Sequence, residues 1–183
     1  MLYTRKGDDG TTKTFGCDQR ISKSSAVAEA LGSLDETNSY LGLCKVVSEK
    51  SGLELGGKKF SEIVHGVQEN LFIIQAEVAG ADKKISEAKI KEIEAFIDAA
   101  EKELPPIKTF FISGGTELAA HFDIARTTAR RAERRVVAAR AEKLVKISDF
   151  TASYLNRLSS LLYALARLSN HKSGIKEPSP KYE

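Results

Sequence analysis

The sequence is poor in residues that hold metals or form covalent cross-links. Its 183 residues include only two cysteines, Cys17 and Cys44, and three histidines, His65, His121 and His171. The cysteine spacing fits neither a metal site nor a redox motif, which predicts reduced thiols and a cytoplasmic location. No two histidines stand at ligand spacing, so we expect no structural zinc or haem site.

The chain also lacks long apolar runs and a large excess of one charge. No stretch approaches the roughly 18 apolar residues of a membrane span, and no signal peptide is evident, so we expect neither a membrane partner nor export. The net charge is only +3, and the cations cluster instead of coating the surface. This pattern favours a local anion site over general affinity for nucleic acid.

Apolar residues recur instead at helical spacing. Five segments place them three and four residues apart, and none alternates as a half-buried strand does. The segments span residues 27–41, 64–78, 90–104, 118–136 and 155–168. Stripes of this kind pack helices side by side. The sequence therefore predicts an all-α fold, a five-helix bundle.

Breakers separate these segments. Pro105 and Pro106 end the third helix, and the hydroxyls of Thr116 and Ser148 can cap the fourth and fifth. The segment Ile107–Ile112 is expected to be a short extended piece. No linker divides the chain, which predicts a single domain with an N-terminal loop, a bundle and an irregular tail at residues 1–24, 25–170 and 171–183.

The N-terminal loop contains the stretch Thr4–Lys13, which reads T-R-K-G-D-D-G-T-T-K. Amides freed by glycine, threonine hydroxyls and cationic side chains can surround phosphate oxygens. The spacing is that of neither a P-loop nor a dinucleotide fingerprint. Taken alone, the stretch is more typical of a turn-rich terminus.

The fourth helix is rich in arginine. Its cations fall on two stripes, Arg126, Arg130 and Arg134 on one and Arg131 and Arg135 on the next. Cations on one stripe repel one another unless anions meet them. Glu133 can neutralise one or two, and partner carboxylates or a polyphosphate should meet the rest. The alternative is a solvated basic face with surface ion pairs.

Other polar residues lie beside the apolar stripes. Asn38 lies on the first stripe, so we expect it to have a buried partner. Asp35 is expected to pair with an arginine of the fourth helix, within the chain or from another subunit, the alternative being a surface acid. Asn156 on the fifth helix can reach a nucleotide or make ordinary boundary hydrogen bonds. Phe110 and Phe111 can wall a flat ligand or close the end of the bundle.

The order of these motifs resembles the PduO-type ATP:cob(I)alamin adenosyltransferases over roughly residues 3 to 168. The motifs are T-R-x-G-D-x-G-x-T, Arg20-x-x-Lys23, G-x-x-D-E-x-N-S-x-x-G at 32–42, Gln68-x-x-Leu71-Phe72, Gly114-Gly115-Thr116, A-R-T-x-x-R-R-A-E-R-R at 125–135 and Tyr154-Leu-Asn-Arg-Leu-Ser159. The resemblance implies a five-helix bundle assembled as a homotrimer with sites between subunits. It implies transfer of the 5′-deoxyadenosyl group of ATP to the cobalt of cob(I)alamin, with Mg²⁺ as cofactor. A cobalamin reductase and a cobalamin-dependent acceptor enzyme are the implied partners.

Carried over by position, the resemblance assigns contacts with ATP to Thr4, Arg5, Lys6, Gly7, Thr12, Lys13, Lys23, Arg130, Arg131, Glu133, Arg134 and Asn156. Mg²⁺ is expected to be held mainly by phosphates, with Glu133 nearby. Asp35 and Arg126 match an ion pair that spans subunits and supports the corrinoid site. Phe110 matches an aromatic ring that displaces the lower axial ligand of cobalamin. The four expected catalytic residues are Arg130, Asp35, Arg126 and Phe110.

Two departures from the family pattern are visible. Ser113 replaces a common proline, which leaves Phe111 as the alternative to Phe110. Gly16–Gln19 stand where a second glycine is common, so the register from Thr12 to Lys23 can shift by one residue. Two other functions are weighed against the enzyme. One is a non-catalytic ATP-binding regulator, and the less fitting one is a nucleic-acid-binding bundle, which should interleave aromatics with its cations.

Overall fold

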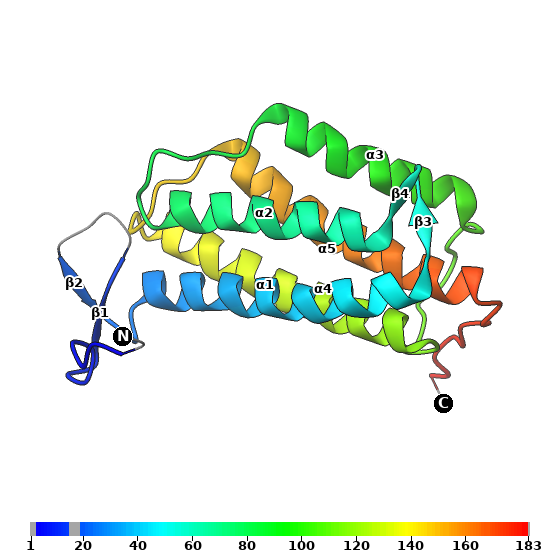
Figure 1. The fold of residues 1–183 in the computed structure, drawn as a ribbon, viewed down its shortest axis with the longest axis horizontal. Helices are drawn as coiled ribbons and strands as arrows, with labels where there is room; N and C mark the ends of the chain where they lie inside the picture. Colours follow the sequence, from blue (N-terminus) through cyan, green and yellow to red (C-terminus); the bar gives the residue numbers. More distant parts are fainter. Residues whose placement is uncertain (1–2, 15–18, 183) are drawn as a thin grey trace.

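A computed structural model describes residues 3–14 and 19–182. Five helices dominate it (Figure 1): α1 (Ala26–Ser51), α2 (Phe60–Val78), α3 (Glu87–Glu103), α4 (Glu117–Ala141) and α5 (Asp149–Lys172). The all-α bundle expected from the five apolar stripes is confirmed. Cys17 and Gly16–Asp18, where the register was in doubt, lie outside the described residues.

The helix boundaries follow the capping chemistry. Thr116 Oγ1 accepts a hydrogen bond from the Ala119 amide at 3.1 Å, and Ser148 Oγ accepts one from the Thr151 amide at 3.2 Å. Both caps were predicted. Ser25 caps α1 in the same way, through the Ala28 amide at 3.3 Å. These hydroxyls satisfy amides that the first helical turn leaves without partners.

Apolar stripes from all five helices meet in one core. α4 packs against α1 and α5, α2 packs against α1, and α3 lies over α5 on the outside of the bundle (Figure 1). Fully buried side chains at its centre include Leu34, Leu41, Phe122, Leu158 and Leu162. The rings of Phe60 and Phe122 meet edge to face, with centroids 6.2 Å apart.

Two short hairpins are present that the sequence pattern did not predict. β1 (Thr11–Lys13) pairs antiparallel with β2 (Arg20–Ser22), with Thr12 opposite Ile21. β3 (Glu54–Leu55) pairs with β4 (Lys58–Lys59) between α1 and α2. Two or three residues per strand are too few to show an alternating pattern. The first hairpin lies at one end of the bundle and the C-terminal tail at the other (Figure 1).

The structure bears on two local expectations. Residues 107–112, expected to be a short extended piece, belong to no helix or strand, and the one main-chain hydrogen bond described for them joins the Ile112 amide to the Pro178 carbonyl at 2.9 Å. Asn38 is buried as expected, but its side-chain Oδ1 has no hydrogen-bond partner among the described residues. Its main-chain carbonyl accepts a hydrogen bond from Gln68 Nε2 at 3.0 Å.

Candidate functional site

The N-terminal loop is folded by its own polar groups. Lys23 Nζ donates to the Gly7 carbonyl at 2.7 Å, and a Cβ on Gly7 would lie 3.1 Å from that ammonium nitrogen. Glycine therefore lets the lysine fold down onto the loop. Arg20 donates to the carbonyls of Thr11 and Lys6, which closes the loop against β2. Arg5 has a left-handed backbone with φ +59°, an uncommon conformation outside glycine.

Asp9 fixes the turn before β1. Its Oδ1 accepts hydrogen bonds from the Thr11 hydroxyl at 2.7 Å and the Thr11 amide at 2.9 Å, and Arg20 lies 3.6 Å away. The Thr11 hydrogen bonds, and then the Arg20 charge, lower the pKa of Asp9 from its ordinary value. The loop therefore keeps its own acid occupied and leaves Thr4, Lys6 and Thr12 facing outward or partly so.

The two arginine stripes of α4 differ in how they are neutralised. Arg131 pairs with Glu36 of α1 at 2.5 Å, and Arg135 pairs with Glu29 of α1 at 3.3 Å. The second stripe is therefore matched by carboxylates of the neighbouring helix. Arg131, one of the expected ATP contacts, already has an acidic partner in the chain.

The first stripe keeps two cations without acidic partners. Among the described residues, neither Arg130 nor Arg134 has a carboxylate within ion-pair distance, and Arg134 donates only to the Arg130 carbonyl at 3.3 Å. Glu133 was expected to neutralise a neighbouring arginine. It forms no described ion pair and instead accepts a hydrogen bond from Asn156 Nδ2 at 3.2 Å. Adjacent unpaired guanidinium groups are suited to an oxyanion ligand.

A hollow beside this stripe lies between α3, α4 and α5. It has a volume of about 390 Å³, and its polar lining includes Arg126, Arg130, Ser159, Ser160 and Tyr163. Arg126 lies 3.6 Å from Asp123, and its guanidinium carbon is 5.9 Å from the centre of the Tyr163 ring. The predicted residues Arg126 and Arg130 thus share one cavity wall.

A second hollow, of about 740 Å³, adjoins the loop between α3 and α4. Its walls include Phe110, Phe111, Arg126, Tyr163 and Tyr182. The side chain of Phe110 is 77% exposed, whereas Phe111 is partly buried with its ring 5.7 Å from the Arg167 guanidinium carbon. Phe110 is therefore the ring that is free to meet a ligand in this hollow.

The remaining predicted residues lie elsewhere. Asp35 is exposed and lines a hollow of about 540 Å³ between α1 and α2, together with Lys13, Phe72 and Gln75. No described ion pair joins Asp35 to an arginine of its own chain, so pairing within the chain is not observed. No hollow described here contains both the N-terminal loop and the α4 arginines.

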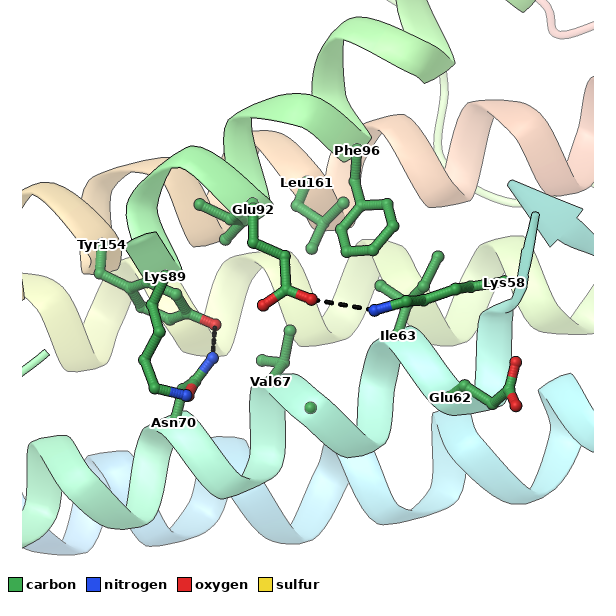
Figure 2. Close-up of a pocket in the computed structure, with 12 residues that line it drawn as sticks. Lys58, Glu62, Ile63, Val67, Asn70, Lys89, Glu92, Phe96, Tyr154 and Leu161 are labelled. Carbon is green, nitrogen blue, oxygen red and sulfur yellow. Dashed lines mark hydrogen bonds and ion pairs between the residues drawn. The ribbon is translucent and has the colours of Figure 1, made fainter. Parts of the chain in front are cut away.

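A separate small, partly open cavity of about 50 Å³ lies between α2, α3 and α5 (Figure 2). There Asn70 Nδ2 donates to the Tyr154 hydroxyl at 3.0 Å, and Lys89 donates to Asn70 Oδ1. Burial raises the pKa of Tyr154, so this hydroxyl stays neutral. Lys58 and Glu92 close the opening with an ion pair at 3.0 Å. The cavity contains no predicted site residue, and its polar groups satisfy one another.

Sequence reasoning missed three residues near the aromatic loop: Asp123, Glu177 and Tyr182. Asp123 stands three residues before Arg126, which is ion-pair spacing on a helix and was a usable signal. Glu177 and Tyr182 belong to a tail that was correctly expected to be irregular, and no local pattern shows where such a tail returns.

Other kinds of site are not evident among the described residues. Among the described residues, no three His, Cys, Asp or Glu side chains cluster as a metal site. None of the helices in the described ranges is long and apolar enough to cross a membrane. Cys44 is a free, buried cysteine, and burial raises the pKa of its thiol to about 12.

The chain is similar in sequence to a known family of proteins. Residues 2–169 match the family described as cobalamin adenosyltransferase. The sequence is 39% identical over 178 residues to the corrinoid adenosyltransferase of Bacillus subtilis strain 168, covering 95% of this chain and 89% of that one. It is 38% identical over 177 residues to corrinoid adenosyltransferase PduO of Citrobacter freundii.

The coverage differs between these relatives. The Citrobacter freundii alignment covers 93% of this chain but 50% of the relative, so the chain spans about half of that protein's length. Among solved structures, a phenylalanine-to-alanine variant of the PduO-type ATP:corrinoid adenosyltransferase from Lactobacillus reuteri, complexed with cobalamin and ATP, is similar with a TM-score of 0.85. The two are 29% identical, and the match covers 99% of each chain.

Proposed function

Because the chain belongs to the cobalamin adenosyltransferase family, we propose that it transfers the 5′-deoxyadenosyl group of ATP to the cobalt of cob(I)alamin. The products are adenosylcobalamin and triphosphate. The observation that carries the proposal is the pair of unneutralised arginines, Arg130 and Arg134, beside Glu133 and Asn156 on the adjoining helices. A polyphosphate would supply the negative charge that these two arginines lack.

ATP is held from two sides in this proposal. The arginine stripe of α4 binds phosphate oxygens, with Asn156 near the nucleoside. The N-terminal loop supplies a lid of hydroxyls, amides and cations, from Thr4 to Gly7 with Thr12, Lys13 and Lys23. Among the hollows described above, none is lined by both the loop and the stripe, which fits a site completed between subunits of a homotrimer.

The reaction requires neither a nucleophile nor a general base from the protein. Co(I) of the substrate donates an electron pair to C5′ of the ribose, and the C5′–O bond breaks with its electrons going to triphosphate. The protein must hold C5′ in line with cobalt and stabilise the charge that develops on the leaving group. The absence of described acidic partners for Arg130 and Arg134 supports assigning the second task to them.

The side chains around the arginine stripe could hold Mg²⁺ only together with the phosphates of ATP. Glu133 offers one carboxylate, and among the described residues it belongs to no group of three potential metal ligands. Magnesium is commonly bound by one or two carboxylates plus substrate phosphates. When bound, it would neutralise part of the triphosphate charge, with Glu133 and the phosphates as its ligands.

The corrinoid is assigned to the hollow walled by Phe110, Arg126 and Tyr163. Phe110 displaces the lower axial ligand there, which makes Co(II) easier to reduce. Asp35 pairs with Arg126 of another subunit and supports this face of the site. A cobalamin reductase supplies the electron, an acceptor enzyme takes the product, and the cytoplasm is the proposed location.

The first experiment follows formation of the cobalt–carbon bond by absorbance, with ATP, Mg²⁺ and chemically reduced cobalamin. The variant Arg130→Ala should lower turnover about 10²- to 10³-fold, the usual effect of removing a charge-stabilising donor. Arg140→Ala is the matched control, because Arg140 is an exposed arginine of α4 whose partner is Asp149. Near-normal turnover of Arg130→Ala would contradict the role of the stripe.

The same assay separates the enzyme from its alternatives. Binding of ATP by the wild-type protein without any alkylcobalamin product would favour a non-catalytic ATP-binding regulator. Binding with steep salt dependence and no preference for ATP would favour nucleic acid.

Phe110 is tested by the oxidation state of the substrate supplied. Phe110→Ala should leave the dissociation constant for ATP unchanged and strongly slow adenosylation that starts from Co(II). Turnover of pre-reduced Co(I) should change much less. The control is Phe150→Ala, which removes an exposed ring at the start of α5. Equal losses with Co(II) and Co(I) would argue against displacement of the axial ligand.

A further inference from the structure

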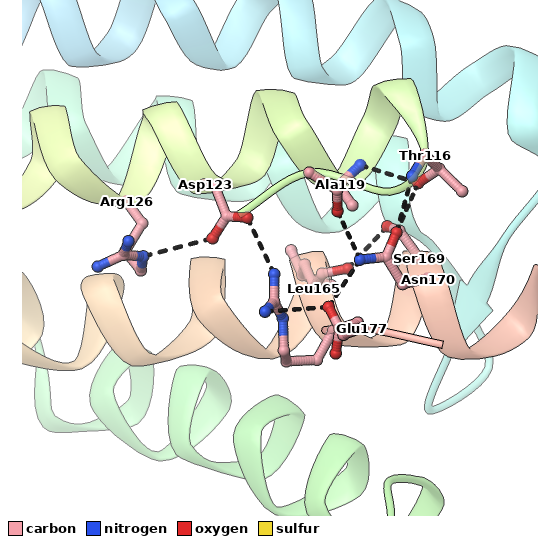
Figure 3. A network of polar contacts seen from close by, with 10 residues as sticks. Thr116, Ala119, Asp123, Arg126, Leu165, Ser169, Asn170 and Glu177 are labelled. Atoms are coloured by element: carbon pink, nitrogen blue, oxygen red, sulfur yellow. Dashed lines mark hydrogen bonds and ion pairs between the residues drawn. The ribbon is translucent and has the colours of Figure 1, made fainter. Parts of the chain in front are cut away.

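A buried charge cluster joins α4, α5 and the C-terminal tail (Figure 3). Arg167 of α5 is only 2% exposed and donates to Asp123 Oδ2 of α4 at 2.9 Å, while Arg126 lies 3.6 Å from the other oxygen of Asp123. The fourth member is Glu177 of the tail, whose Oε1 lies 2.9 Å from Arg167 Nη1. Two cations thus face two carboxylates, and removal of Glu177 leaves a buried excess of positive charge.

Glu177 is also tied to the loop that carries the aromatic residues. Its Oε1 accepts a hydrogen bond from Asn170 Nδ2 at 2.6 Å. The same amide group donates to the Gly114 carbonyl at 2.8 Å, and Asn170 Oδ1 accepts from the Thr116 amide at 2.8 Å. Figure 3 shows Asn170 between Glu177 on one side and Thr116 on the other.

The tail then contacts the loop directly. The Pro178 carbonyl accepts a hydrogen bond from the Ile112 amide at 2.9 Å, two residues after Phe110. Along residues 173–182, Glu177 and Pro180 are the only residues that are not exposed. The tail is therefore anchored chiefly at Glu177, and the next residue holds the loop.

We propose that Glu177 is a positioning residue, which seats the C-terminal tail on Arg167 and Asn170 so that the Pro178 carbonyl holds the aromatic loop beside the corrinoid hollow. This latch, formed by Glu177, Arg167, Asn170 and Pro178, acts on the loop and not on ATP, since none of these four residues belongs to the arginine stripe or to the N-terminal loop. Arg126 of the stripe meets the latch through Asp123. Its effect on catalysis rests on the function proposed above.

The direct test is amide hydrogen exchange of Ile112, which needs no substrate. In Glu177→Ala the Ile112 amide should exchange about tenfold faster or more, as expected when a charge-assisted hydrogen bond is lost. The matched control is Lys176→Ala, which removes the neighbouring exposed side chain of the tail. Exchange of Ile112 that is equal in both variants would overturn the latch.

The second test measures turnover. Glu177→Ala should slow adenosylation from Co(II) about tenfold, with a smaller change from pre-reduced Co(I) and an unchanged dissociation constant for ATP. The fraction of four-coordinate Co(II), read from its electron paramagnetic resonance signal, should fall in parallel. Glu177→Gln retains an acceptor oxygen without the charge and should give intermediate values, and it serves as the test variant if Glu177→Ala does not fold.

These readouts separate the two proposals. Faster Ile112 exchange in a protein that forms no alkylcobalamin would uphold the latch and reject the enzyme. An active enzyme whose Ile112 exchange and four-coordinate Co(II) fraction do not respond to Glu177→Ala would reject the latch alone.

Discussion

At the scale of single residues, the adjacent glycines Gly114 and Gly115 have different surroundings. Both have a backbone conformation that other residues rarely adopt, with φ +120° and +103°. A Cβ on Gly114 would have no neighbour within 4 Å, whereas one on Gly115 would lie 2.4 Å from Asn170 Oδ1. Glycine is favoured at both positions by the backbone conformation, but only at Gly115 is it also required by the close approach of the Asn170 side chain.

This contrast predicts unequal effects of the same change. Gly115→Ala should lower the free energy of unfolding by about 1–3 kcal/mol more than Gly114→Ala, because it adds a clash to a similar backbone strain. The comparison needs only denaturant unfolding of the two variants. If both lose the same stability, the contact between Gly115 and Asn170 has no energetic weight.

At the scale of elements, the helices were predictable and the hairpins were not. The stripe that includes Leu155, Leu158 and Leu162 extends over residues 155–168 of α5, which is long enough to make its helical period clear. β1 and β2 have three residues each, so their stability comes from Arg20 and Asp9 and not from an apolar pattern. Glu177 was equally hidden, because a tail without secondary structure gives no period from which its partner can be inferred.

The first hairpin should respond to pH. The hydrogen bonds of Thr11 and the charge of Arg20 lower the pKa of Asp9, so the folded loop favours the carboxylate. Its stabilising contribution is present at neutral pH and is lost as the pH falls through the lowered pKa. The chemical shift of the Thr11 amide should therefore titrate below the ordinary pKa of an aspartate.

Two variants test that assignment. Asp9→Asn should abolish the titration of the Thr11 amide, and Asp8→Asn should leave it in place. A midpoint at or above the ordinary value for aspartate would show that the hydrogen bonds to Asp9 do not persist in solution.

At the scale of the whole molecule, the expected site residues form separate groups. Phe110 and Arg126 line one hollow, Glu133 of α4 meets Asn156 of α5, and Asp35 lies on α1. The sequence could nominate candidate residues, because each has a distinctive neighbourhood in the chain. It could not predict that they line different hollows, since this depends on how the helices and any further subunits pack.

The pairing of Asp35 with Arg126 across subunits is open to a double-mutant cycle. Asp35→Asn and Arg126→Gln should each weaken cobalamin binding about tenfold or more. The double variant should lose much less affinity than the product of the two single-variant factors. Sedimentation of each variant reports the state of assembly. If the loss of affinity in the double variant equals the product of the two single-variant factors, the two residues do not pair. The control pair is Glu36 and Arg131, which meet within one chain.

The position of α3 has a consequence for how the molecule opens. Because α3 packs mainly on α5, outside the group formed by α1, α2, α4 and α5, it can detach while the other four keep their mutual contacts. Native-state exchange should therefore find α3 as a separate cooperative unit of lower stability. Its last turn leads into the segment that carries Phe110, so each such opening would also release the aromatic wall of the hollow. Transient detachment of one outer helix would then control how often a bulky ligand enters and leaves the hollow.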